Sequence, residues 1–214
     1  FSSSCTVYGQ ADELPITENA PIKPAESPYG NTKQIGEEII RESCKANKLK
    51  AIALRYFNPI GAHETAIIGE LPLGVPQNLI PFVTQTAAGI RKELSVFGDD
   101  YPTNDGTAVR DYIHVVDLAK AHIAALERLM EGKNKKEFEV FNVGTGKGSS
   151  VLEVIKAFEK ISNTKLNYNI VGRREGDITS AYADTTLAKV ELGWETEKTL
   201  EESLLAAWNW QQKQ

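Results

Sequence analysis

Tyr29 and Lys33 lie four residues apart in the stretch SPYGNTK at residues 27–33. On a helix this spacing puts two side chains on the same face, one turn apart. A phenol with an ordinary pKa of about 10 is a poor base at neutral pH, but a neighbouring ammonium group favours the phenolate. The spacing alone is a weak motif, because a chain of this composition also produces it by chance. The two residues are therefore either an acid/base pair or ordinary residues on the exposed face of a helix.

A serine hydroxyl could complete this group. Residues 1–8, FSSSCTVY, place hydroxyl side chains at the end of an opening strand. Open α/β sheets bind ligands at the carboxyl ends of their strands. Ser4 on that strand end could therefore converge with the tyrosine and lysine of the next helix. Its hydroxyl would then position the oxygen that reacts.

The helix that carries the pair has clear start signals. Ser27 and Pro28 suit an N-cap and a first helical position. An apolar stripe follows, formed by Ile35, Ile39 and Ile40. We expect this helix to run to about Asn47. The four prolines between residues 15 and 28 exclude any regular element before it.

Strands and helices alternate along the rest of the chain. The expected strands cover residues 50–57, 94–97, 112–116 and 138–143. The expected helices cover residues 79–90, 117–130, about 151–161 and the last segment after residue 199. Capping boxes mark the last two helices, formed by Ser150 with Glu153 and by Thr199 with Glu202. This alternation predicts an α/β architecture with parallel strand pairing.

Composition excludes several classes of function. A formal net charge of −5 over 214 residues argues against nucleic-acid binding, which needs a basic face. No apolar run reaches the ~18 residues that a membrane span requires. The two cysteines, Cys5 and Cys44, are too few for a disulfide framework, which favours a reducing, cytoplasmic compartment and buried thiols. The three histidines show no metal-binding spacing, so we expect no metal site.

Two further motifs have structural alternatives. The stretch GTGKGSS at residues 144–150 lies where a phosphate loop would lie, but Ser149 stands where the last glycine of a dinucleotide fingerprint belongs. A tight strand-to-helix turn is favoured, with a direct ligand contact as the alternative. Asp111 and Asp117 around His114 could form an acid/base group, but a loop end and a helix cap are the favoured interpretation.

The candidate residues resemble a known family when they are taken with three longer strings. Ser4, Tyr29 and Lys33, together with LRYFNPIGAH, YPTNDGTAVRDYIHV and RREGD, resemble the extended short-chain dehydrogenase/reductase superfamily and, within it, the UDP-glucose 4-epimerase family. The resemblance runs over the whole chain. It implies the C-terminal part of a Rossmann-like, doubly wound parallel sheet together with a smaller α/β substrate-binding domain.

The resemblance also implies a division of the chain. Residues 1–60 would end the NAD domain and carry the catalytic trio. Residues 61–214 would mainly form the UDP-sugar-binding domain, with a segment of about 98–130 returning to the first domain.

The family's reaction assigns roles to the trio. Bound NAD accepts a hydride from C4 of a UDP-hexose, the 4-keto sugar turns over, and the hydride returns to the other face. This interconverts UDP-glucose and UDP-galactose, a step of galactose metabolism. By resemblance Tyr29 is the base and later the acid, Lys33 lowers its pKa and holds the nicotinamide ribose, and Ser4 bonds the sugar oxygen. The nicotinamide end would be lined by Tyr56, Phe57 and Pro59.

The nucleotide half of the substrate is dianionic, so an acidic protein must bind it with local arginines. The resemblance implies these contacts: Arg110 and Arg174 on the diphosphate, Asn58 on the sugar or phosphate, Asn78 and Leu79 on the nucleotide, Phe97 beside the uracil, and Asp177 on the ribose. Each residue alone would pass for a solvated or core side chain. Ala181 falls where the family varies between a bulky aromatic and a small residue, which implies that N-acetylhexosamines are also accepted.

The chain departs from the family at one feature. The glycine-rich turn and the acidic residue that hold the adenosine of NAD do not occur in residues 1–214. We therefore expect a missing N-terminal NAD-binding segment, an inactive isolated chain, and a homodimer in the complete enzyme.

Three alternatives remain. They are a nucleotide-sugar 4,6-dehydratase, a decarboxylase, and a non-catalytic nucleotide-sugar binding module. The dehydratases of this superfamily carry an Asp-Glu pair where Cys5 and Thr6 stand here, which argues against the first.

Overall fold

The first long helix begins where the sequence predicts. In the computed structural model, which describes residues 1–214, this helix is α1 (Pro28–Asn47). The Ser27 hydroxyl accepts a hydrogen bond from the Gly30 amide at 3.1 Å. Pro28 lacks the amide hydrogen that would otherwise need a partner in the first turn. The two candidate catalytic residues of this helix therefore lie in its first two turns.

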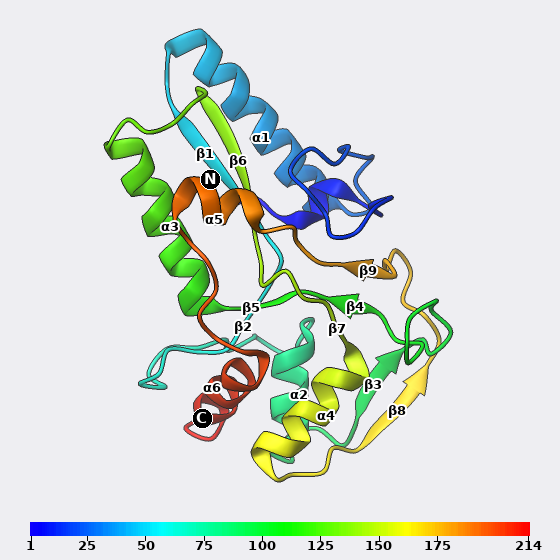
Figure 1. The fold of residues 1–214 in the computed structure, drawn as a ribbon. Coiled ribbons are helices and arrows are strands. Elements are labelled where there is room, and N and C mark those ends of the chain that lie inside the picture. Colours follow the sequence, from blue (N-terminus) through cyan, green and yellow to red (C-terminus); the bar gives the residue numbers. More distant parts are fainter.

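Two parallel strands form the centre of the upper part of the molecule in Figure 1. They are β1 (Ala51–Tyr56) and β6 (Phe138–Val143). Helices α1 and α3 (Val115–Met130) flank this pair. Alternate residues of β1 face the two helices, because successive side chains of a strand point to opposite sides. Ile52 and Leu54 join the apolar cluster beneath α3.

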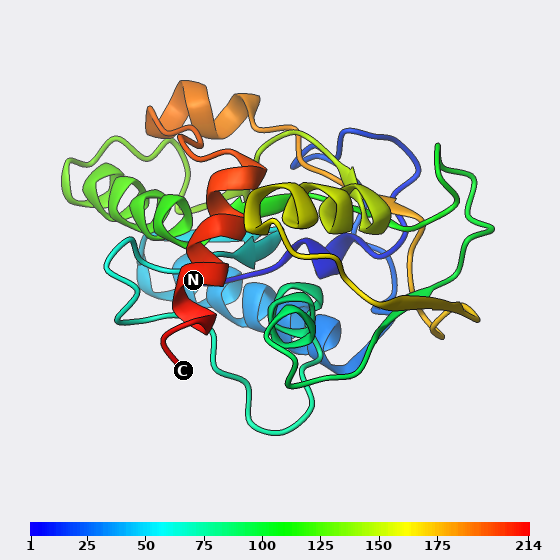
Figure 2. The same cartoon turned by 90° about the horizontal axis from the view of Figure 1, so that it is seen from below.

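The largest apolar cluster is formed by residues from the elements in the lower part of Figure 1, whose helices lie nearest the viewer in Figure 2. Strand β2 pairs with β5 and strand β3 with β8, both in parallel. The capping boxes predicted at Ser150 and Thr199 are confirmed, and they begin α4 and α6. The elements of this part are α2 (Leu79–Ala87), α4 (Val151–Ser162), α6 (Leu200–Gln211), β2 (Asn58–Ile60), β3 (Leu94–Phe97), β5 (Tyr112–His114) and β8 (Tyr168–Val171).

A small sheet lies between the two parts (Figure 1). Its strands, in spatial order, are β7 (Ser149–Ser150), β4 (Val109–Arg110) and β9 (Ser180–Ala181). The predicted α/β architecture is confirmed, but β7 runs antiparallel to β4. Strand β7 is only two residues long and lies in the turn between β6 and α4.

Several predicted boundaries are wrong by a few residues. Helix α2 ends at Ala87, because Gly89 adopts a positive φ of 75°. Helix α3 begins at Val115, two residues before the predicted start. The opening segment bridges to β1 only through Ser2, and the short 3-10 helix η1 (Cys5–Tyr8) follows. Strands β8 and β9 and helix α5 (Thr186–Leu192) were not predicted.

The apolar stripe predicted for α1 does not face the interior. Ile35 is 47% exposed and Ile39 is 61% exposed. The buried side of the helix carries Glu37 and Cys44 instead. Glu37 can lie inside because Arg55 of β1 pairs with it. None of the helices combines the length and the apolar character of a membrane span.

Candidate active site

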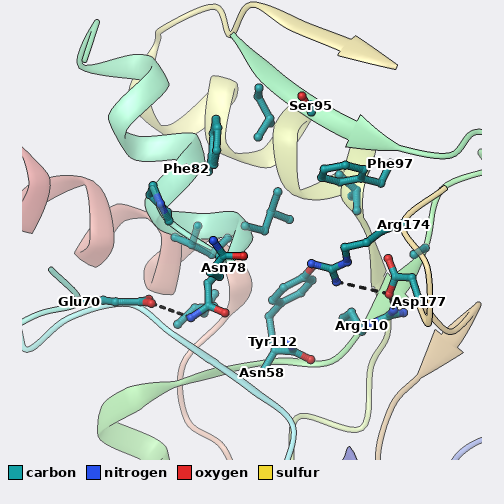
Figure 3. A pocket seen from close by; sticks show the side chains of 18 of the residues that line it. Asn58, Glu70, Asn78, Phe82, Ser95, Phe97, Arg110, Tyr112, Arg174 and Asp177 are labelled. Carbon is teal, nitrogen blue, oxygen red and sulfur yellow. Dashed lines mark hydrogen bonds and ion pairs between the residues drawn. The ribbon is translucent and has the colours of Figure 1, made fainter. Parts of the chain in front are cut away.

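A cavity of about 370 Å³ opens in the lower part of the molecule (Figure 3). This volume falls within the range of roughly 300–1,000 Å³ that is usual for small-molecule sites. Half of the lining residues are hydrophobic. Eight residues that the sequence singled out line it: Asn58, Pro59, Asn78, Leu79, Phe97, Arg110, Arg174 and Asp177. The fold thus brings together segments that are far apart in the chain.

Two guanidinium groups share one carboxylate at an end of this cavity (Figure 3). Arg110 Nη2 donates a hydrogen bond to Asp177 Oδ1, and Arg174 Nη2 lies 3.6 Å from the same oxygen. The Arg110 side chain is only 15% exposed, whereas that of Arg174 is 55% exposed. Two positive charges against one negative charge leave a local excess that suits a phosphate group.

An aromatic wall lies beside these charges. The Phe97 ring is 43% exposed, and the guanidinium carbon of Arg174 lies 5.9 Å from its centroid. Tyr112 forms part of the same lining, and burial raises its pKa to about 12, so its phenol stays neutral. An exposed ring face of this kind can stack on a flat aromatic ligand.

Helix α2 points its first turn toward the cavity. Asn78 precedes the helix but makes no side-chain capping bond. Its side-chain nitrogen, Nδ2, instead donates a hydrogen bond to Glu70 Oε1 at 2.7 Å (Figure 3). The first amides of a helix lack internal partners, and the helix dipole favours anions there. This edge of the cavity therefore offers a second set of donors for an anionic group.

Ser4, Tyr29 and Lys33 lie near one another but outside the cavity lining. Lys33 Nζ lies 5.2 Å from the centroid of the Tyr29 ring and donates to the Ser2 carbonyl at 2.9 Å. The Tyr29 side chain is 51% exposed. Ser4 is buried and begins η1, its hydroxyl accepting from the Thr6 amide at 3.2 Å.

The trio and the cavity are neighbours. A Cβ built on Gly30, beside Tyr29, would lie 3.4 Å from the Thr6 carbonyl, so the first turn of α1 packs against η1. A Cβ built on Gly176 would lie 3.8 Å from the Glu26 carbonyl, just before α1. Gly176 has a φ of 72°, a conformation that favours glycine, and stands between the arginine and the aspartate of the cavity.

Three other predicted site residues, Tyr56, Phe57 and Ala181, do not line the cavity. Phe57 is 3% exposed and Ala181 is 2% exposed, and both belong to a small apolar cluster around Tyr8. Ala181 pairs with Arg110 across β9 and β4, so it stands one strand away from the cavity. Tyr56 ends β1 with its ring 6.2 Å from that of His122.

Asp111 holds the GTGKG turn. Its carboxylate accepts hydrogen bonds from the amides of Thr145 at 2.8 Å and of Gly146 and Ala183 at 3.1 Å. Burial raises the pKa of this carboxyl group. A Cβ on Gly144 would collide with its Oδ2. These contacts support the tight turn that the sequence favoured for residues 144–150.

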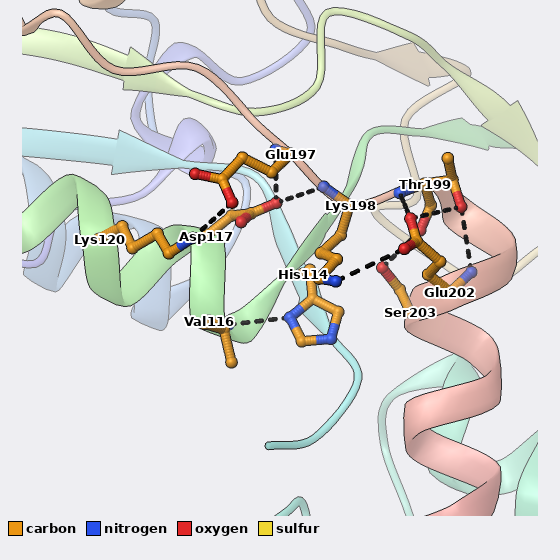
Figure 4. Close-up of polar contacts among 9 residues, drawn as sticks. All are labelled: His114, Val116, Asp117, Lys120, Glu197, Lys198, Thr199, Glu202 and Ser203. Atoms are coloured by element: carbon orange, nitrogen blue, oxygen red, sulfur yellow. Dashed lines mark hydrogen bonds and ion pairs between the residues drawn. The ribbon is translucent and has the colours of Figure 1, made fainter. Parts of the chain in front are cut away.

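His114 and Asp117 organise the start of α3 (Figure 4). His114 Nδ1 accepts from the Val116 amide at 3.0 Å, which makes the imidazole the helix cap. Asp117 Oδ2 accepts from the amides of Glu197 at 3.0 Å and Lys198 at 2.9 Å. Neither residue lines the cavity, which argues against the acid/base group. The expected cap at Asp117 is wrong, because His114 caps α3 and Asp117 lies in its first turn, where it holds the chain at residues 197 and 198. No group of His, Cys, Asp and Glu in the chain is arranged to hold a metal ion.

Sequence reasoning missed several lining residues, among them Glu70, Phe82, Ser95 and Tyr112. Tyr112 stands in a buried strand and has the pattern of a core residue. Glu70 lies in a loop without periodicity. Their positions depend on contacts between distant segments, so no local signal marks them.

The chain matches a family model that is described as GDP-mannose 4,6 dehydratase over residues 1–206. It belongs to this family. Within the GDP-mannose 4,6 dehydratase family, the similar proteins include UDP-glucose 4-epimerases. The enzyme of that name from Drosophila melanogaster is 51% identical over 214 residues, which cover 99% of this chain and 60% of the relative.

Solved structures agree with this placement. A UDP-glucose 4-epimerase from Bifidobacterium longum in complex with NAD+ and UDP has a TM-score of 0.94 and 50% identity, covering 100% of this chain and 63% of that one. One from Stenotrophomonas maltophila with bound NAD and formylated UDP-arabinopyranose has a TM-score of 0.95 and 47% identity, covering 100% and 62%. The chain thus spans less than two thirds of each of these three proteins, and its resemblance to UDP-glucose 4-epimerases is confirmed.

Proposed function

We propose that this chain supplies the acid/base group and the UDP-sugar pocket of a UDP-glucose 4-epimerase, which interconverts UDP-glucose and UDP-galactose. One observation carries the proposal. A cavity with two arginines sharing one aspartate lies beside a helix that presents an exposed tyrosine with a lysine over its ring. About 50% identity to enzymes of that name supports the same assignment.

The cavity would bind the nucleotide diphosphate. Arg110 and Arg174 would turn from Asp177 to the phosphate oxygens, with the first amides of α2 at Leu79 as additional donors. Phe97 would stack on the uracil. Asp177 would accept a hydrogen bond from the ribose, Asn58 would bond the sugar or a phosphate, and Asn78 and Leu79 would contact the nucleotide.

The reacting sugar would lie toward α1. Tyr29 would take the proton of the 4-hydroxyl group and later return it, Ser4 would hold the same oxygen, and Lys33 would support the phenolate. NAD, when bound, supplies the hydride acceptor and donor. The residues present fit its nicotinamide end, because Tyr29 is exposed and Lys33 lies beside it. Lys33 would hold the nicotinamide ribose, with Tyr56, Phe57 and Pro59 near the ring.

Several finer assignments belong to the same proposal. Residues 1–60 would form the C-terminal part of the NAD domain, and the remaining chain would mainly form the substrate domain. Ala181 would leave room for an acetamido group, which extends the substrate range to UDP-N-acetylglucosamine and UDP-N-acetylgalactosamine. The complete enzyme would act as a cytoplasmic homodimer, with the adenosine of NAD held by a segment outside residues 1–214.

The name of the family model favours a dehydratase as a second candidate. Loss of water from the sugar needs an acid near the catalytic serine. Burial raises the pKa of Cys5 to about 12, and the buried Thr6 hydroxyl has no hydrogen-bond partner. Neither side chain is suited to deliver a proton at neutral pH, so we favour the epimerase.

Calorimetric titration of the chain with UDP tests the pocket, and a coupled assay of the complete enzyme with UDP-galactose tests the reaction. We expect UDP to bind the isolated chain and the isolated chain to lack turnover. An isolated chain that bound no UDP would overturn the pocket assignment. Release of a 4-keto-6-deoxy sugar by the complete enzyme would favour the dehydratase.

A further inference from the structure

One wall of the cavity is the loop between β2 and α2, residues 61–77. Four of its side chains line the cavity: Glu70, Val75, Pro76 and Gln77. Leu73 in this loop is 98% exposed and Ile67 is 73% exposed, whereas the buried apolar residues of the loop are the small Ala62, Ala66 and Pro76, so burial of large apolar side chains does little to hold it. Contacts from outside the loop must therefore fix its position.

The main contact of this kind comes from Trp210 in α6. A Cβ built on Gly69 would fall 2.5 Å from the indole Cγ, so the loop backbone lies directly against the ring, as only glycine permits. Trp210 Nε1 donates a hydrogen bond to the Glu70 carbonyl at 3.1 Å. Lys213 Nζ adds a bond to the Thr65 carbonyl at 2.8 Å. Trp210 in α6 and Lys213 just after it thus hold the loop at Thr65, Gly69 and Glu70.

Glu70 makes a second contact through its side chain. Its carboxylate accepts a hydrogen bond from the side-chain amide of Asn78 at 2.7 Å (Figure 3). Asn78 is the N-cap residue of α2 but makes no side-chain capping bond. Pro81 at the third helical position has no amide hydrogen, so the Ile80 amide is the donor that such a bond would use. The contact with Glu70 draws the Asn78 amide away from the helix start. The amides of Leu79 and Ile80 therefore stay available on the cavity side, whereas Pro81 has no amide hydrogen to offer.

We propose that Trp210 is a positioning residue for the nucleotide-sugar site. It fixes Glu70, Glu70 holds Asn78, and the first turn of α2 is left free for an anionic group of the ligand. Trp210 itself does not line the cavity, so it acts only through the loop. Without it, the Asn78 side chain turns to cap its own helix and competes with the anion. The identity of the ligand rests on the proposed function, whereas the chain of contacts does not.

Calorimetric titration of the chain with UDP tests this role. Trp210→Phe keeps a ring but removes the donor, and we expect UDP binding about 3- to 10-fold weaker, the effect of one hydrogen bond. Glu70→Ala should weaken it similarly, and the double variant should be no worse than the single ones. Glu70→Gln, which can still accept from Asn78, should retain the wild-type affinity.

Trp208→Phe is the matched control. Trp208 lies in the same helix but packs edge-on against Phe158, with ring centroids 5.6 Å apart, away from the loop. We expect its UDP affinity to stay within about twofold of wild type. A lower melting temperature in Trp210→Phe with an unchanged dissociation constant would mean that Trp210 only stabilises the fold, and would overturn the inference.

A second measurement needs no ligand. In nuclear magnetic resonance spectra of the free chain, Trp210→Phe should shift the side-chain amide signals of Asn78, and Trp208→Phe should not. Wild type that binds UDP while Trp210→Phe binds equally well refutes the inference alone. Wild type that binds no UDP refutes the proposed function, and unchanged Asn78 signals in Trp210→Phe then refute the chain of contacts as well.

Discussion

Arg55 and Glu37 form a two-bond ion pair inside the protein, with nitrogen–oxygen distances of 2.8 and 2.6 Å. Glu37 is 1% exposed and Arg55 is 3% exposed. Ser3 donates a further hydrogen bond to the carboxylate at 2.5 Å. The pair joins β1 to α1 one turn after Lys33, so it sets how the helix that carries the proposed catalytic residues sits on the sheet.

Glu37→Ala should therefore destabilise the chain. It leaves a buried guanidinium without its partner, and we expect the free energy of unfolding to fall by about 3–5 kcal/mol. Glu42→Ala removes an exposed pair with Lys45 on the same helix and should cost no more than about 0.5 kcal/mol. Urea denaturation followed by circular dichroism measures both. Equal losses in the two variants would show that the buried pair has no special structural role.

Arg174→Ala should weaken UDP binding by roughly 10- to 100-fold, the usual effect of losing a hydrogen bond to a charged group. Arg173→Ala is the matched control. The guanidinium of Arg173 donates a hydrogen bond to Asp100 at 2.7 Å and lies over the Tyr101 ring, so it is already engaged outside the cavity. We expect less than a twofold change there. Titration calorimetry with UDP measures both affinities. If Arg173→Ala lost as much UDP affinity as Arg174→Ala, the effect would come from the overall positive charge of this region and not from a phosphate contact of Arg174.

Tyr29→Phe in the complete enzyme should lower kcat by at least about 100-fold, because general acid/base groups usually contribute 10²–10⁴-fold. UDP affinity should stay close to wild type, since Tyr29 lies outside the cavity lining. Tyr168→Phe, on the exposed strand β8, should change neither quantity. An active Tyr29→Phe enzyme would assign the proton transfer to another group.

The sequence predicted best those features that depend on neighbouring residues. Ser27 and Ser150 begin their helices as expected, because a capping bond needs only residues two or three positions away. The strand at residues 138–143 was predicted correctly because it is a short apolar run bounded by turns. The helix at His114 begins earlier than expected, because an imidazole is an unusual cap.

Features that depend on distant contacts could not be predicted. The stripe of Ile35 and Ile39 faces outward because the ion pair of Glu37 takes the inner face. All four residues of strand β8 are exposed, so it lacks the alternation between buried and exposed residues that marks a strand. The cavity-lining residues were found through family resemblance and not through a local pattern. Trp210 had no signal of either kind.

The stability of the protein should depend on pH through the protonation of His114. Burial lowers the pKa of His114, while Asp117, Lys198, Glu202 and Lys120 contribute opposing charges around it. Between this lowered pKa and the ordinary value of about 6.5, the unfolded chain binds more protons than the folded chain. The free energy of unfolding should therefore fall as the pH drops below about 6.5.

His114→Asn tests this, because asparagine can still cap α3 but does not titrate. From about pH 7.5 to about pH 5.5, wild type should lose more unfolding free energy than this variant, because only wild type carries the buried imidazole with the lowered pKa. His63→Asn, in a surface loop, should follow wild type. Urea denaturation at the two pH values gives the difference, and parallel losses in wild type and His114→Asn would contradict the assignment.

Ala181 should set the range of sugars that the complete enzyme accepts. Its methyl group lies in the cluster that contains Tyr8 and Phe57, next to Arg110 across the sheet. On the proposed substrate range, a phenol at this position would extend from the cluster into the space that the acetamido group would take, and overpacking a tight site costs about 1–3 kcal/mol. Ala181→Tyr should therefore remove turnover of UDP-N-acetylglucosamine while UDP-galactose is still converted.

The ratio of kcat/KM for the two substrates is the quantity to measure, because general destabilisation by a buried phenol lowers both values together and leaves their ratio unchanged. Ala181→Val should give an intermediate ratio, since its side chain takes up only part of the space. The role of Ala181 would be refuted by an unchanged ratio in Ala181→Tyr, or by a wild-type enzyme that turns over UDP-galactose but not UDP-N-acetylglucosamine.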